Sequence, residues 1–240
     1  MLAEPGGEPR RHSTSDADGI IAASHNNLAR LYHAQGAYPK AEPLLVRALD
    51  IREKVLGPMH PDVAQSLNNL GELYSDQGAY DKAEPLFVRA LDIRERALGP
   101  MHPDVAQSLN NLASVYADQG AYSKAEPLYV RALDIREKAL GSMHPNVAES
   151  LNNLAALYQA RGALAKVEPL LVRALNIREK AQGPMHPDVA GSLNDLAALY
   201  QAHGAYGKAE PLGRAAVCTR TRHRKEGAGA TTSRRREQPQ

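Results

Sequence analysis

The chain has 240 residues, of which 43% are hydrophobic and 23% charged, a normal composition for a soluble protein; it contains no Trp, one Phe and ten Tyr. This scarcity of large aromatic residues disfavours a single deep core and favours a thin architecture built from Leu, Ala and Val. A single Cys excludes a disulfide framework and a Cys-based zinc site, and no run of about eighteen apolar residues could span a membrane. We therefore predict a soluble, cytoplasmic protein with no membrane association.

Glycine and tyrosine recur with a period of 42 residues, at Gly36, Gly78, Gly120, Gly162 and Gly204 and at Tyr32, Tyr74, Tyr116, Tyr158 and Tyr200. Residues 58–99 and 100–141 are identical at 35 of 42 positions, which chance cannot produce. Such a period is typical of proteins that stack supersecondary units. We predict a disordered segment at residues 1–19, then repeats at about 20–57, 58–99, 100–141, 142–183 and, incomplete, 184–212.

Each repeat predicts a first helix with one apolar stripe, formed in the second repeat by Val63, Leu67, Leu70 and Tyr74. Pro61 can occupy its first position, and Gly78 can end it in a left-handed conformation. A second helix is indicated by a stripe at Ala83, Leu86, Phe87, Ala90, Leu91, Ala97 and Leu98. Asp81 and Glu84 predict a capping box at its start, and Gly99 ends it.

These helix pairs resemble the tetratricopeptide repeat, whose pattern of large, small and aromatic positions is matched by Leu67, Leu70, Gly71, Tyr74, Ala83, Phe87 and Ala90. The long period and phrases such as Ser-Leu-Asn-Asn-Leu are similar to the repeats of kinesin light chains and nephrocystin-3. The resemblance covers about residues 20–212 and implies an all-α, right-handed α-solenoid of five helix-turn-helix units.

The resemblance also implies a scaffold or adaptor that binds a peptide or a partner helix in a concave groove. A light chain that joins a motor would carry a long heptad-bearing helix before its repeats, and only about nineteen residues precede the first repeat here, so a motor subunit is not predicted. The alternative is a regulatory or self-associating repeat module of a signalling protein.

By the family pattern, the first helix of each repeat lines the groove. The candidate groove residues are Asn26, Asn27, Arg30, Gln65, Asn68, Asn69, Glu72, Asp76, Gln107, Asn110, Asn111, Asp118, Glu149, Asn152, Asn153, Gln159, Asn194 and Asp195. An Asn pair recurs among them, and a side-chain amide can both donate to and accept from a peptide backbone. We predict that the first Asn of each pair faces the groove; alternatively, one Asn of each pair bonds to the neighbouring helix and fixes the stacking. The variable positions lean acidic, which favours a basic or neutral ligand.

Two other residue types recur with the repeat. His60, His102, His144 and His186 each precede a proline; equivalent points on stacked helices lie about 8–10 Å apart, so these side chains cannot share a zinc ion. We predict a structural role at the helix start, and no metal or cofactor.

An arginine recurs beside the apolar stripe of the second helix, at Arg52, Arg94, Arg136 and Arg178. They could bind phosphate. We favour a different arrangement, in which the aliphatic stem of each arginine lies on apolar surface and its guanidinium pairs with an acidic neighbour. No catalytic motif is present, so we predict no enzymatic activity.

Residues 213–240 hold eight Lys or Arg and two acidic residues, in a chain of net charge +2. This segment has neither aromatic residues for base stacking nor an amphipathic period, so we predict a disordered tail that binds neither nucleic acid nor membrane. The repeat pattern breaks off after Leu212, which suggests a frame-disrupted end. An incomplete last repeat would leave Leu193, Leu196 and Tyr200 poorly covered, and this predicts weak head-to-tail self-association.

Overall fold

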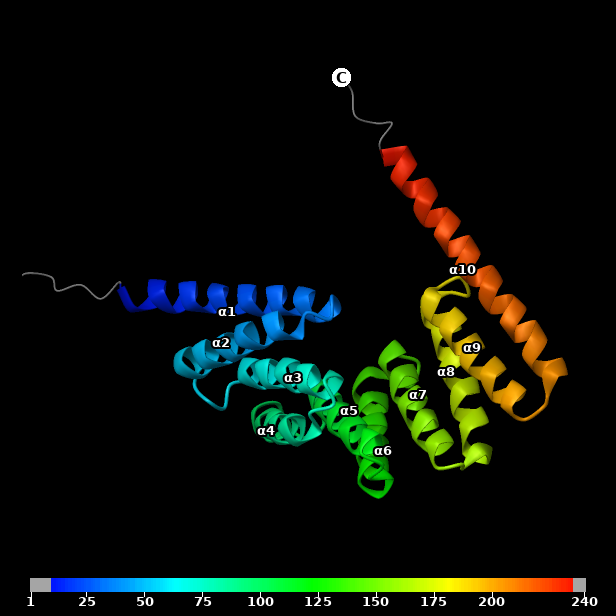
Figure 1. The fold of residues 1–240 in the computed structure, drawn as a ribbon, viewed down its shortest axis with the longest axis horizontal. Helices are drawn as coiled ribbons and strands as arrows, with labels where there is room; N and C mark the ends of the chain where they lie inside the picture. Colours follow the sequence, from blue (N-terminus) through cyan, green and yellow to red (C-terminus); the bar gives the residue numbers. More distant parts are fainter. Residues whose placement is uncertain (1–9, 235–240) are drawn as a thin grey trace, which may run out of the picture. The chain divides into compact units, whose positions relative to one another are not determined.

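The computed structural model describes the backbone of residues 10–234 and the side chains of residues 17–221. This part of the chain contains ten α-helices and one 3₁₀ turn, and no strand (Figure 1). The helices are α1 (Arg10–Ala34), α2 (Tyr38–Leu56), α3 (Pro61–Asp76), α4 (Tyr80–Leu98), α5 (Pro103–Asp118), α6 (Tyr122–Leu140), α7 (Pro145–Ala160), α8 (Val167–Gln182), α9 (Pro187–Ala202) and α10 (Tyr206–Arg234), with η1 (Leu164–Lys166) before α8. The predicted all-α series of tandem helix-turn-helix repeats is confirmed.

The chain divides into two compact units, residues 1–121 with α1–α5 and residues 122–240 with α6–α10. In the first unit each helix packs on the next one along the chain, and α3 also contacts α1 and α5. In the second unit α6 packs on α7, α7 on α8, α8 on α9 and α9 on α10. Each unit is therefore a stretch of α-solenoid in which the core lies between neighbouring helices.

The apolar stripes meet both within and between repeats. Within the second repeat, Val63 and Leu67 of α3 pack in one buried cluster with Ile93 of α4. Between the first two repeats, Leu73 of α3 shares a buried cluster with Leu45 of α2. Since each helix pair has too narrow an apolar face to fold alone, the contacts between repeats stabilise the array.

The helix ends follow from the prolines, histidines and glycines of the repeat. Pro61 takes the first position of α3, and Nδ1 of His60 accepts a hydrogen bond of 3.1 Å from the backbone N–H of Asp62. His102, His144 and His186 cap α5, α7 and α9 in the same way. The histidines satisfy backbone N–H groups that would otherwise lack partners. Their predicted structural role at the helix start is confirmed.

The capping box predicted at the start of α4 is wrong. The helix begins at Tyr80, and its N-cap residue, Ala79, makes no side-chain cap. The turn after Gly78, whose φ is 72°, places the backbone N–H of Ala79 2.8 Å from the carbonyl of Tyr74, and this bond fixes the helix start ahead of Asp81.

The Glu that should have completed the box instead accepts a hydrogen bond from a tyrosine of the next repeat. Within the first unit, the hydroxyl of Tyr74 donates to Glu42 at 2.7 Å and that of Tyr116 donates to Glu84 at 2.8 Å. Burial, together with the bond to Glu42, raises the pKa of Tyr74 to about 12. These bonds add a polar link between successive repeats.

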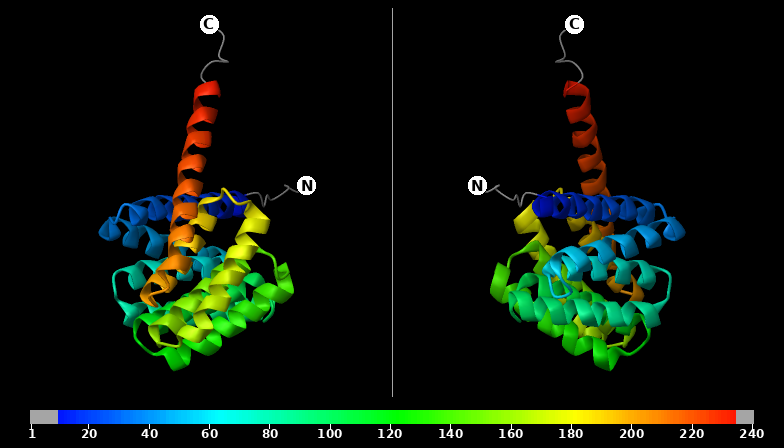
Figure 2. Two further views of the ribbon diagram at one scale, coloured as in Figure 1. Left: turned by 90° about the vertical axis from the view of Figure 1, so that its right-hand side faces the viewer. Right: turned by 90° about the vertical axis from the view of Figure 1, so that its left-hand side faces the viewer.

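The last helix extends much further than the sequence predicts. Residues 213–234, expected to be disordered, continue α10, which runs back along α9 and well past its N-terminal end (Figures 1 and 2). Ala216 packs in a cluster with Val189 and Leu193 of α9, and Leu196 is also buried. The prediction of a poorly covered α9 is therefore wrong, because α10 keeps the buried alanine of earlier second helices, such as Ala90 of α4 and Ala174 of α8. Residues 1–9 of the predicted N-terminal segment and 235–240 of the tail lie outside the described residues, whereas residues 10–19 belong to α1.

Candidate peptide-binding groove

A groove of about 490 Å³ lies on the face of the first unit that α1, α3 and α5 form. It is lined by Ala23, Asn26, Asn27, Arg30, Arg52, Gln65, Asn69, Glu72 and Gln107. A hollow of about 300 Å³ shares Arg30, Asn69 and Glu72 with the groove and also borders His33. The structure thus brings most of the predicted residues of this unit together, and it adds Ala23 and Arg52, which the sequence analysis did not include.

The second unit has a smaller hollow of about 400 Å³, where Asn152, Asn153, Gln159 and Asp195 lie among small apolar residues. Burial raises the pKa of Asp195, against a lowering influence from Arg178. Two further candidates in this unit lie outside the hollow. Glu149 is 3.4 Å from the buried guanidinium of Arg136, and Asn194 is half-buried.

The prediction that the first Asn of each pair faces the groove is wrong for Asn68 and Asn110, which are buried and do not line it, whereas Asn26 is buried but does line it. Nδ2 of Asn68 donates to Oγ of Ser108 on α5 at 3.3 Å, so this amide bonds between neighbouring repeats, as the alternative interpretation held. The second Asn of the pair, Asn69, is half-buried and lines the groove, and its Nδ2 donates to Oδ1 of Asn26 at 3.3 Å. Asn68 and Asn110 therefore belong to the packing of the array rather than to the groove surface.

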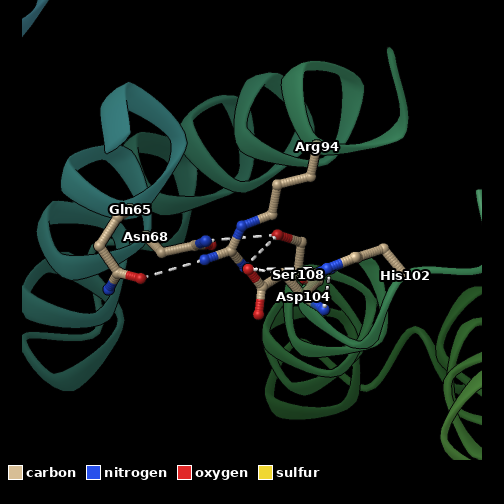
Figure 3. Close-up of polar contacts among 6 residues, drawn as sticks. All are labelled: Gln65, Asn68, Arg94, His102, Asp104 and Ser108. Atoms are coloured by element: carbon tan, nitrogen blue, oxygen red, sulfur yellow. Dashed lines mark hydrogen bonds and ion pairs between the residues drawn. The ribbon is translucent and has the colours of Figure 1, made fainter. Parts of the chain in front are cut away.

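A buried arginine completes this polar contact (Figure 3). Arg94 extends from α4 between α3 and α5, and its Nη1 donates to Oγ of Ser108 at 2.9 Å and to the carbonyl of Asp104 at 2.8 Å. Its Nη2 donates to Oε1 of Gln65 at 3.2 Å. We call the arginine of a second helix, with the serine and the backbone carbonyl of the next first helix, the arginine clamp.

The clamp recurs at the other junctions described within each unit. Arg52 donates to Ser66 and to the carbonyl of Asp62, Arg136 to Ser150 and to the carbonyl of Asn146, and Arg178 to Ser192. Arg94 and Arg136 are only 4% and 2% exposed, so the predicted position of their stems at the surface is wrong, although the guanidinium of Arg136 does lie 3.4 Å from an acidic neighbour, Glu149. Burial lowers the pKa of Arg94, partly offset by Asp104 and Glu72. The recurrence of Arg with Ser fourteen residues later was visible in the sequence, but nothing there indicated that the two meet.

The charged residues that line the groove are Glu72, Arg30 and Arg52, and two further carboxylates lie near them, because Asp76 influences both Glu72 and Asp118. Partial burial among the helices raises the pKa of Glu72, and the charge of Asp76 raises it further, whereas the hydrogen bond from Asn111, His33 and Arg30 lower it. Burial and Asp76 likewise raise the pKa of Asp118. Asp76 itself lies 2.8 Å from Nε2 of His33. The groove therefore holds ionised carboxylates at an energetic cost, which a cation from outside would relieve.

We predict that Glu72→Gln raises the free energy of unfolding at neutral pH by up to about 1 kcal/mol, a small gain because solvent screens this partly exposed group. Gln keeps the oxygen that accepts from Nδ2 of Asn111, a bond of 3.0 Å in the wild type. A carboxyl whose pKa is raised by folding favours the folded state at low pH and loses that contribution as the pH rises through the raised pKa. The advantage of Gln should therefore vanish below about pH 4. Urea unfolding of both proteins across pH tests this, and a Gln variant that is less stable at neutral pH would contradict it.

Comparison with known proteins agrees with this architecture. The tetratricopeptide repeat family profile matches residues 20–96, 76–138, 104–180 and 146–217. No protein among those with a curated description matches the chain. Within the described residues, no helix is both long enough and apolar enough to cross a membrane.

Several solved structures are similar to the chain. BtubC (BKLC) from P. vanneervenii is 29% identical with a TM-score of 0.76, the match covering 90% of this chain and 86% of BtubC. A kinesin light chain-like protein of Podosopora anserina with nearly identical TPR-like repeats is 28% identical with a TM-score of 0.71, over 87% of this chain and 98% of that one. The Rap protein complexed with competence and sporulation factor, 17% identical with a TM-score of 0.70 over 83% of this chain and 55% of its own, shares the fold alone. The chain belongs to the tetratricopeptide repeat family, and kinesin light chain-like proteins are among its structural neighbours.

Proposed function

We propose that the groove of the first unit binds an extended segment of a partner protein that carries at least one Lys or Arg. Tetratricopeptide repeats generally mediate contacts between proteins. The observation that supports a basic ligand is the pair of carboxylates Glu72 and Asp118, whose pKa values are raised by burial first and by the charge of the neighbouring Asp76 second. A cationic side chain placed there would stabilise all three.

The amides of the groove support binding of the ligand's backbone. Gln65 and Gln107, which are exposed, and Asn69, which is half-buried, all line the groove. Nδ2 of Asn26, a buried residue that lines the groove, donates to no group among the described residues. A peptide carbonyl is a suitable acceptor for such amides. In this proposal the amides hold the main chain and the carboxylates select the side chain.

The test uses the whole protein and three labelled peptides of equal length, with Lys, Gln or Glu at alternate positions of one neutral background. We expect the Lys peptide to bind at least about tenfold more tightly than the Glu peptide. The double variant Glu72→Gln, Asp118→Asn should weaken the Lys peptide by about tenfold. The control is Asp92→Asn, which removes a carboxylate that pairs with Arg96 at 2.8 Å on α4. Tighter binding of the Glu peptide, or an unchanged affinity in the double variant, would reject the proposal.

The same interaction should depend on pH. Because Glu72 and Asp118 have raised pKa values, they become neutral at a higher pH than ordinary carboxyls do. As the pH is lowered, affinity for the Lys peptide should therefore begin to fall at a higher pH than ordinary carboxyls would give, while Lys itself stays charged. We further propose that binding of a partner in this groove serves a scaffold or adaptor role in the cytoplasm, as expected from the sequence.

A further inference from the structure

The outward face of α1 carries apolar residues that interior repeats bury. Ile21, Leu28 and Leu31 are 44%, 42% and 54% exposed, whereas their counterparts one period later, Val63, Leu70 and Leu73 of α3, are 0%, 5% and 0% exposed. The difference lies in the helix that precedes each one. In the second repeat, α2 of the first repeat covers these positions with Leu45 and Leu49. The face of α1 therefore has the shape and chemistry that receive the second helix of a repeat.

The serine of the arginine clamp gives the same indication. Ser66, Ser108, Ser150 and Ser192 are buried, each bonded to the arginine of the preceding repeat. Their counterpart in α1 is Ser24, which is exposed. The first helix of the array thus presents the acceptor half of a clamp as well as the apolar half of an interface.

The complementary halves lie on α10. Leu133 and Leu175 of the second helices α6 and α8 pack on the first helix of the following repeat, as Leu49 does in the first unit. The residue at this register position in α10 is Val217, which is 62% exposed. Three residues further along, at the position of the clamp arginine, is Arg220, which is also exposed. α10 thus carries the apolar side chain and the hydrogen-bond donor, Val217 and Arg220, that would contact the first helix of a following repeat.

We infer that the face of α10 that carries Val217 and Arg220 docks on the face of α1 that carries Ile21, Ser24 and Leu28 in a second copy of this chain. The contact continues the interface that joins successive repeats, with Arg220 of one copy donating to Ser24 of the other. Because the two surfaces differ, the contact is heterologous, and a copy that docks through one face can accept a further copy on its other face. The chain therefore forms head-to-tail assemblies that grow with concentration.

The experiment measures the weight-average mass of the full chain by sedimentation equilibrium from about 5 µM to about 500 µM. The mass of the wild type should rise steadily without stopping at a dimer. Ile21→Asp blocks the α1 face and Val217→Asp blocks the α10 face, and each should weaken association by at least about tenfold. The matched control is Val88→Asp on α4. Val88 is also exposed, at 46%, but its repeat already has a neighbouring repeat on each side, so this residue should not take part in the contact between copies. Circular dichroism of each variant verifies that its helices are intact.

Mixing the two blocked variants provides the decisive result. Ile21→Asp retains a working α10 face and Val217→Asp a working α1 face, so an equimolar mixture should form a one-to-one dimer and nothing larger. A wild type that stays monomeric throughout, or that saturates as a dimer, overturns the inference. So does a mixture that remains monomeric, or an assembly that Val88→Asp abolishes and Val217→Asp leaves unchanged.

Discussion

The Arg94→Ala variant should lose about 3 kcal/mol of the free energy of unfolding, because the substitution removes both a buried stem and the donor of a polar network. Arg94 is 4% exposed and bonds to Ser108, Gln65 and the carbonyl of Asp104. With Ala in its place, Gln65 and Ser108 lose their charged donor, and the space of the guanidinium lies between α3, α4 and α5. The buried Ser108 keeps only the weaker bond from Asn68, and the loss of its charged donor falls on the junction between two repeats.

The burial of this arginine also works against stability, since desolvation lowers its pKa. The arginine clamp therefore stabilises the fold only while the groups that accept hydrogen bonds from Arg94 are present. Arg94→Lys keeps the charge but cannot donate to three groups from one planar head, so it should cost nearly as much as Arg94→Ala. Arg96→Ala is the matched control, because Arg96 is exposed on the same helix and pairs with Asp92 at 2.8 Å. Its loss should change stability by less than about 0.5 kcal/mol.

Repeat arrays can unfold in parts, so the measurement should be local as well as global. Urea unfolding gives the total change, and amide hydrogen exchange shows where protection is lost. We expect faster exchange in α4 and α5, on both sides of the clamp. If Arg94→Ala and Arg96→Ala are equally stable, or if exchange increases only at the chain ends, the clamp does not join the repeats.

The sequence predicted the helices well because their signals are local. Pro61 and Gly78 mark the two ends of α3, and the apolar stripe of that helix needs no knowledge of the rest of the chain. His60 could be placed at a helix start for the same reason. These residues act within one turn of their own position, and the His and the Pro recur in each of the three repeats that follow.

The polar contacts between repeats could not be predicted in the same way. Asn68 and Asn69 are adjacent at the edge of the apolar stripe, and only the position of α5 decides that Asn68 is buried against Ser108 while Asn69 lines the groove. Arg94 lies beside the stripe of α4, where a surface stem and a buried clamp have the same sequence pattern. Hollows lie along the first helices in each unit, but which amide of each Asn pair lines them depends on packing.

The composition of residues 213–234 does not predict the helix that they form, whereas their positions in the 42-residue repeat do. A segment rich in Arg and poor in apolar residues suggested disorder, yet Ala216 and Thr219 stand at positions that the second helix of a repeat buries, and both are buried in α10. Two small residues at the right spacing are enough to keep a helix on its neighbour when the neighbour supplies the larger side chains.

Gly71→Ala should lower the free energy of unfolding by about 2 kcal/mol, although Ala is the better helix former by about 1 kcal/mol. Gly71 lies inside α3, and a Cβ added there would sit 2.7 Å from Cε1 and 2.8 Å from Cζ of Phe87, whose ring is buried in α4. Contacts that short force the ring or the helix to move. Gly191→Ala is the control, because that glycine also lies inside a first helix but has no atom within 4 Å of an added Cβ. There the same substitution should stabilise the protein by up to about 1 kcal/mol.

A second substitution shows whether the ring of Phe87 causes the loss of stability in Gly71→Ala. The first repeat has Ala29 and Leu45 at the corresponding positions, both buried in one cluster. Phe87→Leu alone should cost about 1 kcal/mol, because it leaves space beside the glycine. Combined with Gly71→Ala it recreates the Ala–Leu pair, so the double variant should be more stable than Gly71→Ala alone, and the two changes should be non-additive by at least about 1 kcal/mol. Additive losses in urea unfolding, or a Gly71→Ala variant that gains stability as Gly191→Ala does, would show that the ring of Phe87 does not determine the residue at position 71.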